Sequence, residues 1–175
     1  EIMGFLKKVS RLVASENLPV CWTTPKPLNF PVQMMCYKKE SKRVKTKMGD
    51  SIIKLSIQSD TDEIDKRKTA QSICPNLIHS LDASCLMLAV IKAKDKGVTN
   101  FSLIHDSFGC VAPDVHKLSE AIREAFCEVY EQDVLTNWAM EMKQMLSEKN
   151  AKKFPHIPER GNLDLSLVKQ SIFFC

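Results

Sequence analysis

The segment 103–109 places an aspartate directly after a run of apolar residues. Its sequence is Leu-Ile-His-Asp-Ser-Phe-Gly, and apolar stretches at 101–105 and 108–112 flank Asp106 and Ser107. This pattern predicts a β-hairpin that holds the Asp106 carboxylate rigidly at the end of a strand, between buried neighbours. Such a carboxylate suits Mg²⁺, which prefers carboxylate oxygens together with substrate phosphates. Aspartate also favours turns for purely local reasons, and the spacing leaves both interpretations open.

A second polar group lies at 74–84, in the sequence Cys-Pro-Asn-Leu-Ile-His-Ser-Leu-Asp-Ala-Ser. In a helix, His79 and Ala83 lie on one face, and Asp82 lies one turn from His79. A histidine at this place could donate a hydrogen bond to a ribose, a base edge or a phosphate. Histidines near the start of a helix are also often satisfied by local contacts, so His79 alone does not identify a site.

The elements that must position these groups are mostly helical, which predicts an α+β fold with a short antiparallel hairpin. Apolar spacing predicts an amphipathic helix at 2–13 and short strands at 20–22, 32–37 and 52–57. Asp60 or Thr61 could cap a polar helix at 62–72, which Pro75 interrupts. We then expect three further helices, at 76–96 (ending at Gly97), 114–131 and 132–148.

Length and composition restrict the class of protein. The chain has 175 residues, of which 44% are hydrophobic and 26% charged, so it is long enough for one globular domain and is not a disordered protein. We find no apolar run near the roughly 18 residues of a membrane helix and no signal-peptide pattern, so we expect no membrane partner. The seven cysteines are scattered without a Cys-x-x-Cys pair, which favours reduced thiols over zinc or disulfides.

Positive charge is concentrated in the first third of the chain. Residues 1–50 carry 10 Lys and Arg against 4 Asp and Glu, although the whole chain has a net charge of only +4. Six of the basic residues lie within 38–47. If this segment is a strand, Arg43, Lys45 and Lys47 lie on one side of it, as contact with a nucleic-acid backbone requires. A solvated surface explains the same run equally well.

The two motifs together resemble a known family. The pattern Pro-Asn-x-x-His-Ser-x-Asp-x-Ser at 75–84, followed by His-Asp-Ser-Phe-Gly at 105–109, is similar to the C-terminal part of single-subunit, bacteriophage T7-like DNA-directed RNA polymerases. Mitochondrial RNA polymerases belong to the same broad group. The resemblance extends from the opening helix to Gly-Asn-Leu-Asp-Leu at 161–165 and the phenylalanine-bearing tail, and it is densest at 70–112.

The resemblance implies the C-terminal part of a right-hand polymerase fold. Residues 1–78 would derive from the fingers, and residues 79–175 would form the palm with its motif C hairpin and a C-terminal foot. Asp106 would bind both catalytic Mg²⁺ ions, His105 would support the primer terminus, and His79 would lie by the minor groove and sense the ribose of the incoming nucleotide. The foot would include Phe174 and Cys175; T7-like enzymes end in a small residue after phenylalanine, so Cys175 departs from the pattern.

The reaction implied is template-directed nucleotidyl transfer by two metal ions. The chain contains neither a motif A segment, which would supply the second aspartate, nor a motif B helix. In this family both motifs lie upstream, so we expect a polymerase several times longer, acting as a monomer on a DNA template, an RNA transcript and nucleoside triphosphates. We expect these 175 residues alone to be inactive.

Two alternatives remain open at this point. A family A DNA polymerase shares the His-Asp pair, but there the pair is usually followed by Glu, whereas here Ser107 follows it. A prophage remnant or a nucleic-acid-binding module could retain the hairpin without a reaction. For location we expect a phage or prophage enzyme in the cytoplasm of a bacterial host, with a mitochondrial enzyme as the second choice.

Overall fold

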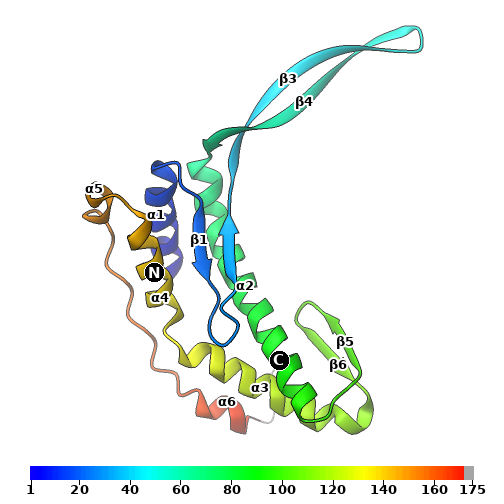
Figure 1. The fold of residues 1–175 in the computed structure, drawn as a ribbon, viewed down its shortest axis with the longest axis vertical. Coiled ribbons are helices and arrows are strands. Elements are labelled where there is room, and N and C mark those ends of the chain that lie inside the picture. The colour runs from blue at the N-terminus through cyan, green and yellow to red at the C-terminus, as the bar shows by residue number, and fades with distance from the viewer. Residues whose placement is uncertain (172–175) are drawn as a thin grey trace.

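The computed structural model describes residues 1–171 as a body of helices from which two β-hairpins project (Figure 1). The strands pair as three separate antiparallel hairpins, β1–β2, β3–β4 and β5–β6, which confirms the predicted α+β class. In chain order the elements are α1 (Ile2–Ser15), β1 (Val20–Thr23), β2 (Pro31–Met34), β3 (Tyr37–Met48), β4 (Ser51–Ile64), α2 (Lys66–Asp95), β5 (Phe101–Ile104), β6 (Ser107–Cys110), the 3₁₀ turn η1 (Ala112–Asp114), α3 (Val115–Glu131), α4 (Val134–Met145), α5 (Glu148–Ala151) and α6 (Ser166–Gln170).

The main core lies where α1, α4 and the first half of α2 meet. The predicted apolar stripe of α1 is confirmed, because Phe5, Leu6, Val9 and Val13 are all buried. The Phe5 ring packs edge-on against Trp138 of α4, with the ring centroids 6.3 Å apart. The β1–β2 hairpin also packs on this core, through residues that include Val20, Trp22 and Met34.

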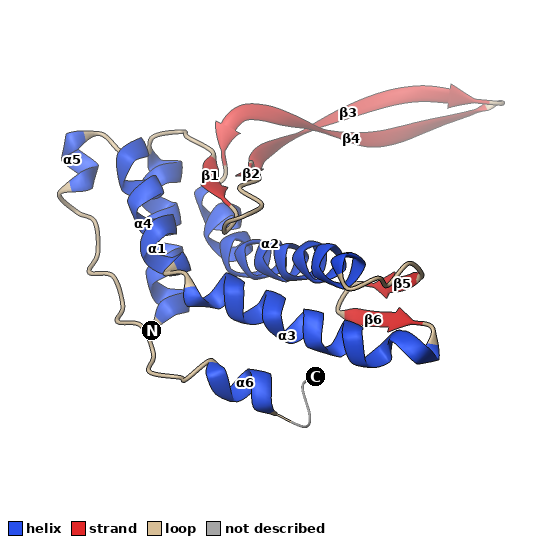
Figure 2. Ribbon diagram, turned by 60° about the horizontal axis from the view of Figure 1, so that its bottom comes forward, coloured by secondary structure: helices blue, strands red, loops and turns tan. Residues whose placement is uncertain are grey.

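A second core joins the C-terminal half of α2 to α3, which lie side by side (Figure 2). Small residues such as Ala89 and Ala125 are fully buried there and let the two helices approach closely. Phe108 of β6 packs against this interface and so attaches the β5–β6 hairpin to the helical body. Gly97, with a φ of 88°, ends α2 as predicted, because such a left-handed conformation suits glycine.

The helix α2 is one continuous element, so the predicted break at Pro75 is wrong. A proline inside a helix removes one hydrogen bond and costs about 3 kcal/mol. Ile73 and Leu77, on either side of Pro75, are buried in the main core, and burying two such side chains contributes a comparable or larger free energy. Tertiary packing therefore outweighs the local preference.

The predicted start of the polar helix is also wrong, because residues 60–64 belong to β4. Asp60 pairs with Lys39, and Ile64 pairs with Tyr37. The helix begins instead after Asp65, whose side chain accepts hydrogen bonds from the backbone N–H groups of Arg67 and Lys68, each at 2.9 Å. The strands of this hairpin are consequently much longer than the sequence pattern predicts.

The length and composition of α2 would allow it to cross a membrane, which the apolar-run criterion does not detect. This observation is weak evidence, since the central helix of a packed core passes the same test. In the described structure α2 packs against α1 and α3. The cysteines within the described residues are all free thiols, in agreement with the prediction.

Ile73→Ala tests the packing that keeps α2 continuous. Ile73 has an exposed fraction of 0%, so its truncation should lower the free energy of unfolding by about 2–5 kcal/mol. Ile91→Ala is the matched control, because Ile91 lies on the same helix but is 47% exposed, and its truncation should change stability by less than about 0.5 kcal/mol. Urea denaturation measures both; an equal destabilisation of the two variants would contradict this account of the core.

Candidate functional site

The turn of the β5–β6 hairpin and one face of α2 enclose a pocket of about 690 Å³. His105 and Asp106 line it from the hairpin. The pocket residues of α2 recur at the spacing of a single helical face: His79, Asp82, Ala83, Leu86 and Met87. The fold therefore brings His79, His105 and Asp106, which lie in two separate sequence motifs, into one cavity.

The turn itself consists of His105 and Asp106, because Ile104 pairs directly with Ser107. His105 has a φ of 53°, a conformation that non-glycine residues seldom adopt. Further along β6, a Cβ atom at Gly109 would lie 3.3 Å from the Cβ and carbonyl oxygen of Ser102, so this glycine permits close pairing of the two strands. The turn is thus one residue earlier than the pair Asp106-Ser107 that the apolar stretches flank.

The neighbours of Asp106 are exposed, which contradicts the expectation that they are buried. Leu103 is 36% exposed and Ile104 is 68% exposed, and Asp106 itself is exposed. Within residues 1–171, β5 and β6 pair only with each other. The local sequence pattern correctly predicts the strand β5. Burial of its residues requires another element to pack over them, and the described residues supply none over this part of the hairpin.

Asp82 is a pocket residue to which the sequence motifs assign no role. Its position one turn after His79 is the signal that could have identified it, because that spacing places both side chains on the same face. At the interface between α2 and α3, burial raises the pKa of Cys85 to about 11 and that of Tyr130 to about 12. The negative charge of Asp82 is a smaller cause that raises both pKa values in the same direction.

The donor set of the pocket fits part of a magnesium site. Among residues 1–171, no three His, Cys, Asp or Glu side chains gather closely enough to hold a metal ion by themselves. Asp106 offers one exposed carboxylate, and Asp82 faces the same cavity. Because Mg²⁺ typically takes one or two carboxylates and completes its shell with water and phosphate oxygens, Asp106 suits the role of one ligand among several.

The second candidate region is the β3–β4 hairpin, which we call the arm (residues 37–64). Its strands contain 12 and 14 residues and extend away from the body (Figure 1). Arg43, Lys45 and Lys47 lie on one face, as the strand prediction requires, and all three are exposed. Cross-strand pairing adds Lys54, which is directly opposite Lys45. These four residues form the basic face of the arm.

The opposite face of the arm is largely apolar, a feature that the sequence pattern did not reveal. The strand register places five apolar residues on it: Val44, Met48, Ile53, Leu55 and Ile57. The apolar face can be recognised only when the pairing register of β3 and β4 is known, because a shift of one residue would exchange the two faces of a strand. With Lys42 and Ile52 as exceptions, the basic and apolar side chains of residues 42–57 are therefore sorted onto opposite faces of one ribbon.

Phe174 and Cys175, the predicted foot residues, lie outside the described residues. The nearest described contact is a hydrogen bond of 3.0 Å from Arg123 Nη2 to the carbonyl oxygen of Ser171. It connects the segment after α6 to α3. The predicted boundary between residues 78 and 79 falls inside α2, so the two proposed segments share this helix.

Comparison with known proteins identifies the family. The family described as DNA-dependent RNA polymerase matches residues 1–153, which is most of the chain. The chain belongs to this family. The resemblance of the two motifs to single-subunit RNA polymerases is thereby confirmed.

The relatives of this RNA polymerase chain include plant organellar enzymes. It is 39% identical over 173 residues to DNA-directed RNA polymerase 2, chloroplastic/mitochondrial, of Arabidopsis thaliana, in a match that covers 99% of the chain but only 16% of that relative. DNA-directed RNA polymerase 1, mitochondrial, of Nicotiana sylvestris is 35% identical with the same coverage. The chain thus spans about one-sixth of the length of these relatives. DNA-directed RNA polymerase 1A of Nicotiana tabacum is 35% identical, and the match covers 93% of the chain and 99% of that relative.

Proposed function

We propose that this chain is the C-terminal catalytic portion of an RNA polymerase that adds nucleotides to a transcript under the direction of a DNA template. The observation that carries the proposal is the pocket in which Asp106, His105 and His79 meet. Its partners would be nucleoside triphosphates, the DNA template, the RNA product and the upstream part of the same polypeptide. We expect the intact enzyme to act as a monomer.

Asp106 would serve as a ligand of two Mg²⁺ ions. When bound, such ions activate the attacking 3′-hydroxyl group and stabilise the leaving pyrophosphate oxygens. The hairpin would hold the Asp106 carboxylate at a defined point, because Phe108 attaches it to the α2–α3 interface. The exposed Ile104 supports the expectation that a further segment, carrying the second aspartate, covers the hairpin in the intact enzyme. The isolated chain would then lack part of the metal site and be inactive.

His79 and His105 would recognise the substrates. His79 lies on the pocket face of α2, from which an imidazole N–H can donate to a ribose hydroxyl group. His105 would support the primer terminus, and its positive φ supports a functional reason for histidine in this turn. In this proposal residues 1–78 belong to the fingers and residues 79–175 to the palm and foot, with Phe174 and Cys175 near the active centre.

The basic face of the arm would contact nucleic acid. Lys45 and Lys54 lie directly opposite each other, and like charges in such a pair destabilise a hairpin. A phosphate backbone would relieve this repulsion, which supports a polyanion as the partner of Arg43, Lys45, Lys47 and Lys54.

The family match favours an RNA polymerase over a family A DNA polymerase. The plant relatives named above support location in an organelle, the mitochondrial alternative, and do not support the bacterial host that we expected. If the protein is a remnant without catalytic activity, replacing Asp106 will not lower the rate of nucleotide addition, and the following test would show this.

Asp106→Asn in the intact enzyme should lower the rate of nucleotide addition by about a thousandfold or more. Metal ions stabilise the transition state of such transfers by several kcal/mol, and the amide is a poor ligand for Mg²⁺. Single-turnover extension of a primed template measures the effect. Asp95→Asn is the control, because Asp95 is an exposed aspartate at the far end of α2. Equal rates for both variants would remove Asp106 from the metal site.

His79→Ala should reduce the preference for ribonucleotides over deoxyribonucleotides by about tenfold. That ratio corresponds to the removal of one hydrogen bond of about 1.4 kcal/mol. Competition between matched ribo- and deoxyribonucleoside triphosphates measures the preference, and His116→Ala on α3 is the control. If selectivity stays unchanged while the protein remains folded, His79 has no role in sensing the ribose.

Replacing Arg43, Lys45 and Lys47 with Ala should weaken binding to duplex DNA and reduce its salt dependence. The slope of log K against log salt should fall by roughly 3, close to one for each phosphate that the arm no longer neutralises. The matched control replaces Lys149, Lys152 and Lys153, which are exposed and carry the same total charge. A similar change in both variants would mean that net charge matters and the arm does not.

A further inference from the structure

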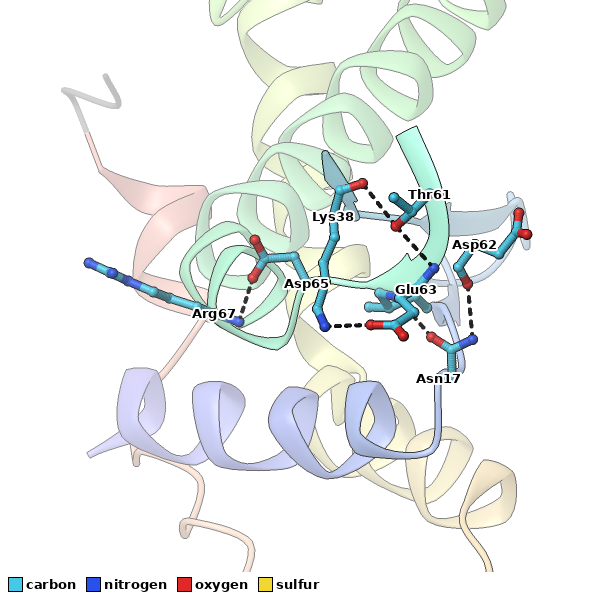
Figure 3. Close-up of polar contacts among 8 residues, drawn as sticks. Asn17, Lys38, Thr61, Asp62, Glu63, Asp65 and Arg67 are labelled. Atoms are coloured by element: carbon cyan, nitrogen blue, oxygen red, sulfur yellow. Dashed lines mark hydrogen bonds and ion pairs between the residues drawn. The ribbon is translucent and has the colours of Figure 1, made fainter. Parts of the chain in front are cut away.

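The arm is attached to the body at its base by the side chain of Asn17. The Asn17 amide Nδ2 donates to the carbonyl oxygen of Asp62 at 3.1 Å, and the backbone N–H of Ile64 donates to Asn17 Oδ1 at 2.8 Å (Figure 3). One carboxamide thus pairs with the C=O of one residue and the N–H of the residue two positions later. A neighbouring strand would pair with β4 in the same way.

Asn17 is held in place by α1, which belongs to the main core. It follows the last turn of this helix with a φ of 58°, a left-handed conformation that asparagine tolerates better than most residues. Its backbone N–H donates to the carbonyl oxygen of Ala14 at 3.2 Å. Val13 and Ala14, at the end of α1, are buried. The side chain of Asn17 therefore extends from a rigid part of the backbone.

Other polar contacts at the base hold the two strands of the arm to each other. Lys38 of β3 and Glu63 of β4 form an ion pair of 2.5 Å, whose hydrogen bond raises the pKa of Lys38 and lowers the pKa of Glu63. Thr61 donates a hydrogen bond to the carbonyl oxygen of Lys38 (Figure 3). Both interactions lie within the arm, so neither determines its direction relative to α1.

The length of the arm makes its direction sensitive to the base. The 14 residues of β4 span about 45 Å at roughly 3.4 Å per residue. A rotation of about 10° at Ile64 would move the tip by about 8 Å, and would move Lys45, which pairs with Lys54, by about 6 Å. Such displacements are larger than a hydrogen bond, so contacts made by the basic face depend on the geometry at its base.

We propose that Asn17 is a positioning residue, which fixes the direction of the arm relative to the helical body through its paired hydrogen bonds to Asp62 and Ile64. The consequence for nucleic acid rests on the proposed function: the basic face would meet the backbone at one defined place.

The test replaces Asn17 with Gly in the intact protein. Glycine adopts the same positive φ without strain, so this change removes the side-chain hydrogen bonds and keeps the backbone. Asn29→Gly is the matched control, because Asn29 has a similar φ of 50° but lies in the β1–β2 turn. Asn17→Asp is a second variant, which keeps the acceptor for Ile64 N–H and removes the donor to Asp62.

Two measurements report the direction of the arm. Hydrogen exchange at the Ile64 amide should become about fivefold faster in Asn17→Gly, the ratio expected for removal of one hydrogen bond. Pulsed EPR between spin labels at Asp50 in the turn of the arm and Lys149 on α5 should give a broader distance distribution. The labels require non-cysteine chemistry, because the chain has seven cysteines. Asn17→Asp should lie between Asn17→Gly and the parent, and Asn29→Gly should match the parent.

Distances as narrow in Asn17→Gly as in Asn29→Gly would overturn the proposal. Equal broadening in both variants would also overturn it, because the effect would then be general. DNA cleavage by an iron chelate tethered at Asp50 tests the consequence for nucleic acid, and Asn17→Gly should spread the cut over more positions. If distances broaden but neither Asn17→Gly nor the Arg43/Lys45/Lys47 variant alters DNA binding, Asn17 still positions the arm and the nucleic-acid role of the arm fails.

Discussion

Burial of Ile73 and Leu77 on either side of Pro75 keeps α2 in one piece, and the other parts of the structure are arranged along this 30-residue helix. Its first half packs with α1 and α4, and its second half packs with α3. The arm enters it at Asp65, and β5 follows shortly after its C-terminal end. A helix broken at Pro75 would separate these regions. The wall of the pocket would then no longer have a fixed position relative to the base of the arm.

The two projecting hairpins are supported in different ways. The β5–β6 hairpin is held along its side by Phe108, which packs on the α2–α3 interface, so its turn lies at a defined distance from the face of α2 that carries His79. The arm is held at its base, and its two faces are exposed along most of its length. Packing along the side of a hairpin suits a side chain that must contact a reacting atom, because it fixes the position of the turn. Support at the base suits a long element whose direction, more than its internal geometry, determines what it reaches.

The two turns also show how the backbone conformation of a turn restricts the residue type at each position. Both are two-residue turns whose first residue has a positive φ: 63° at Gly49 in the arm and 53° at His105 in the β5–β6 hairpin. Glycine adopts this conformation freely, whereas for other residues it costs about 1–2 kcal/mol. The arm thus uses the unstrained residue at its turn. A histidine in the equivalent place, beside an exposed aspartate, is understandable if its imidazole has a task in the pocket.

Local sequence determined the elements whose signals are short in range. The stripe of α1, the hairpin around Asp106, the end of α2 at Gly97 and the alternation of Arg43, Lys45 and Lys47 follow from periodicity and turn chemistry. The motifs at 75–84 and 105–109 were enough to recognise the family. Tertiary structure decided what depends on partners distant in the chain: the continuity of α2 through Pro75, the length of the arm, the apolar face opposite its basic one, and the meeting of Asp82 with Asp106. The physical reason is that periodicity reports which side of an element is apolar, whereas burial and register depend on the surface that packs or pairs against it.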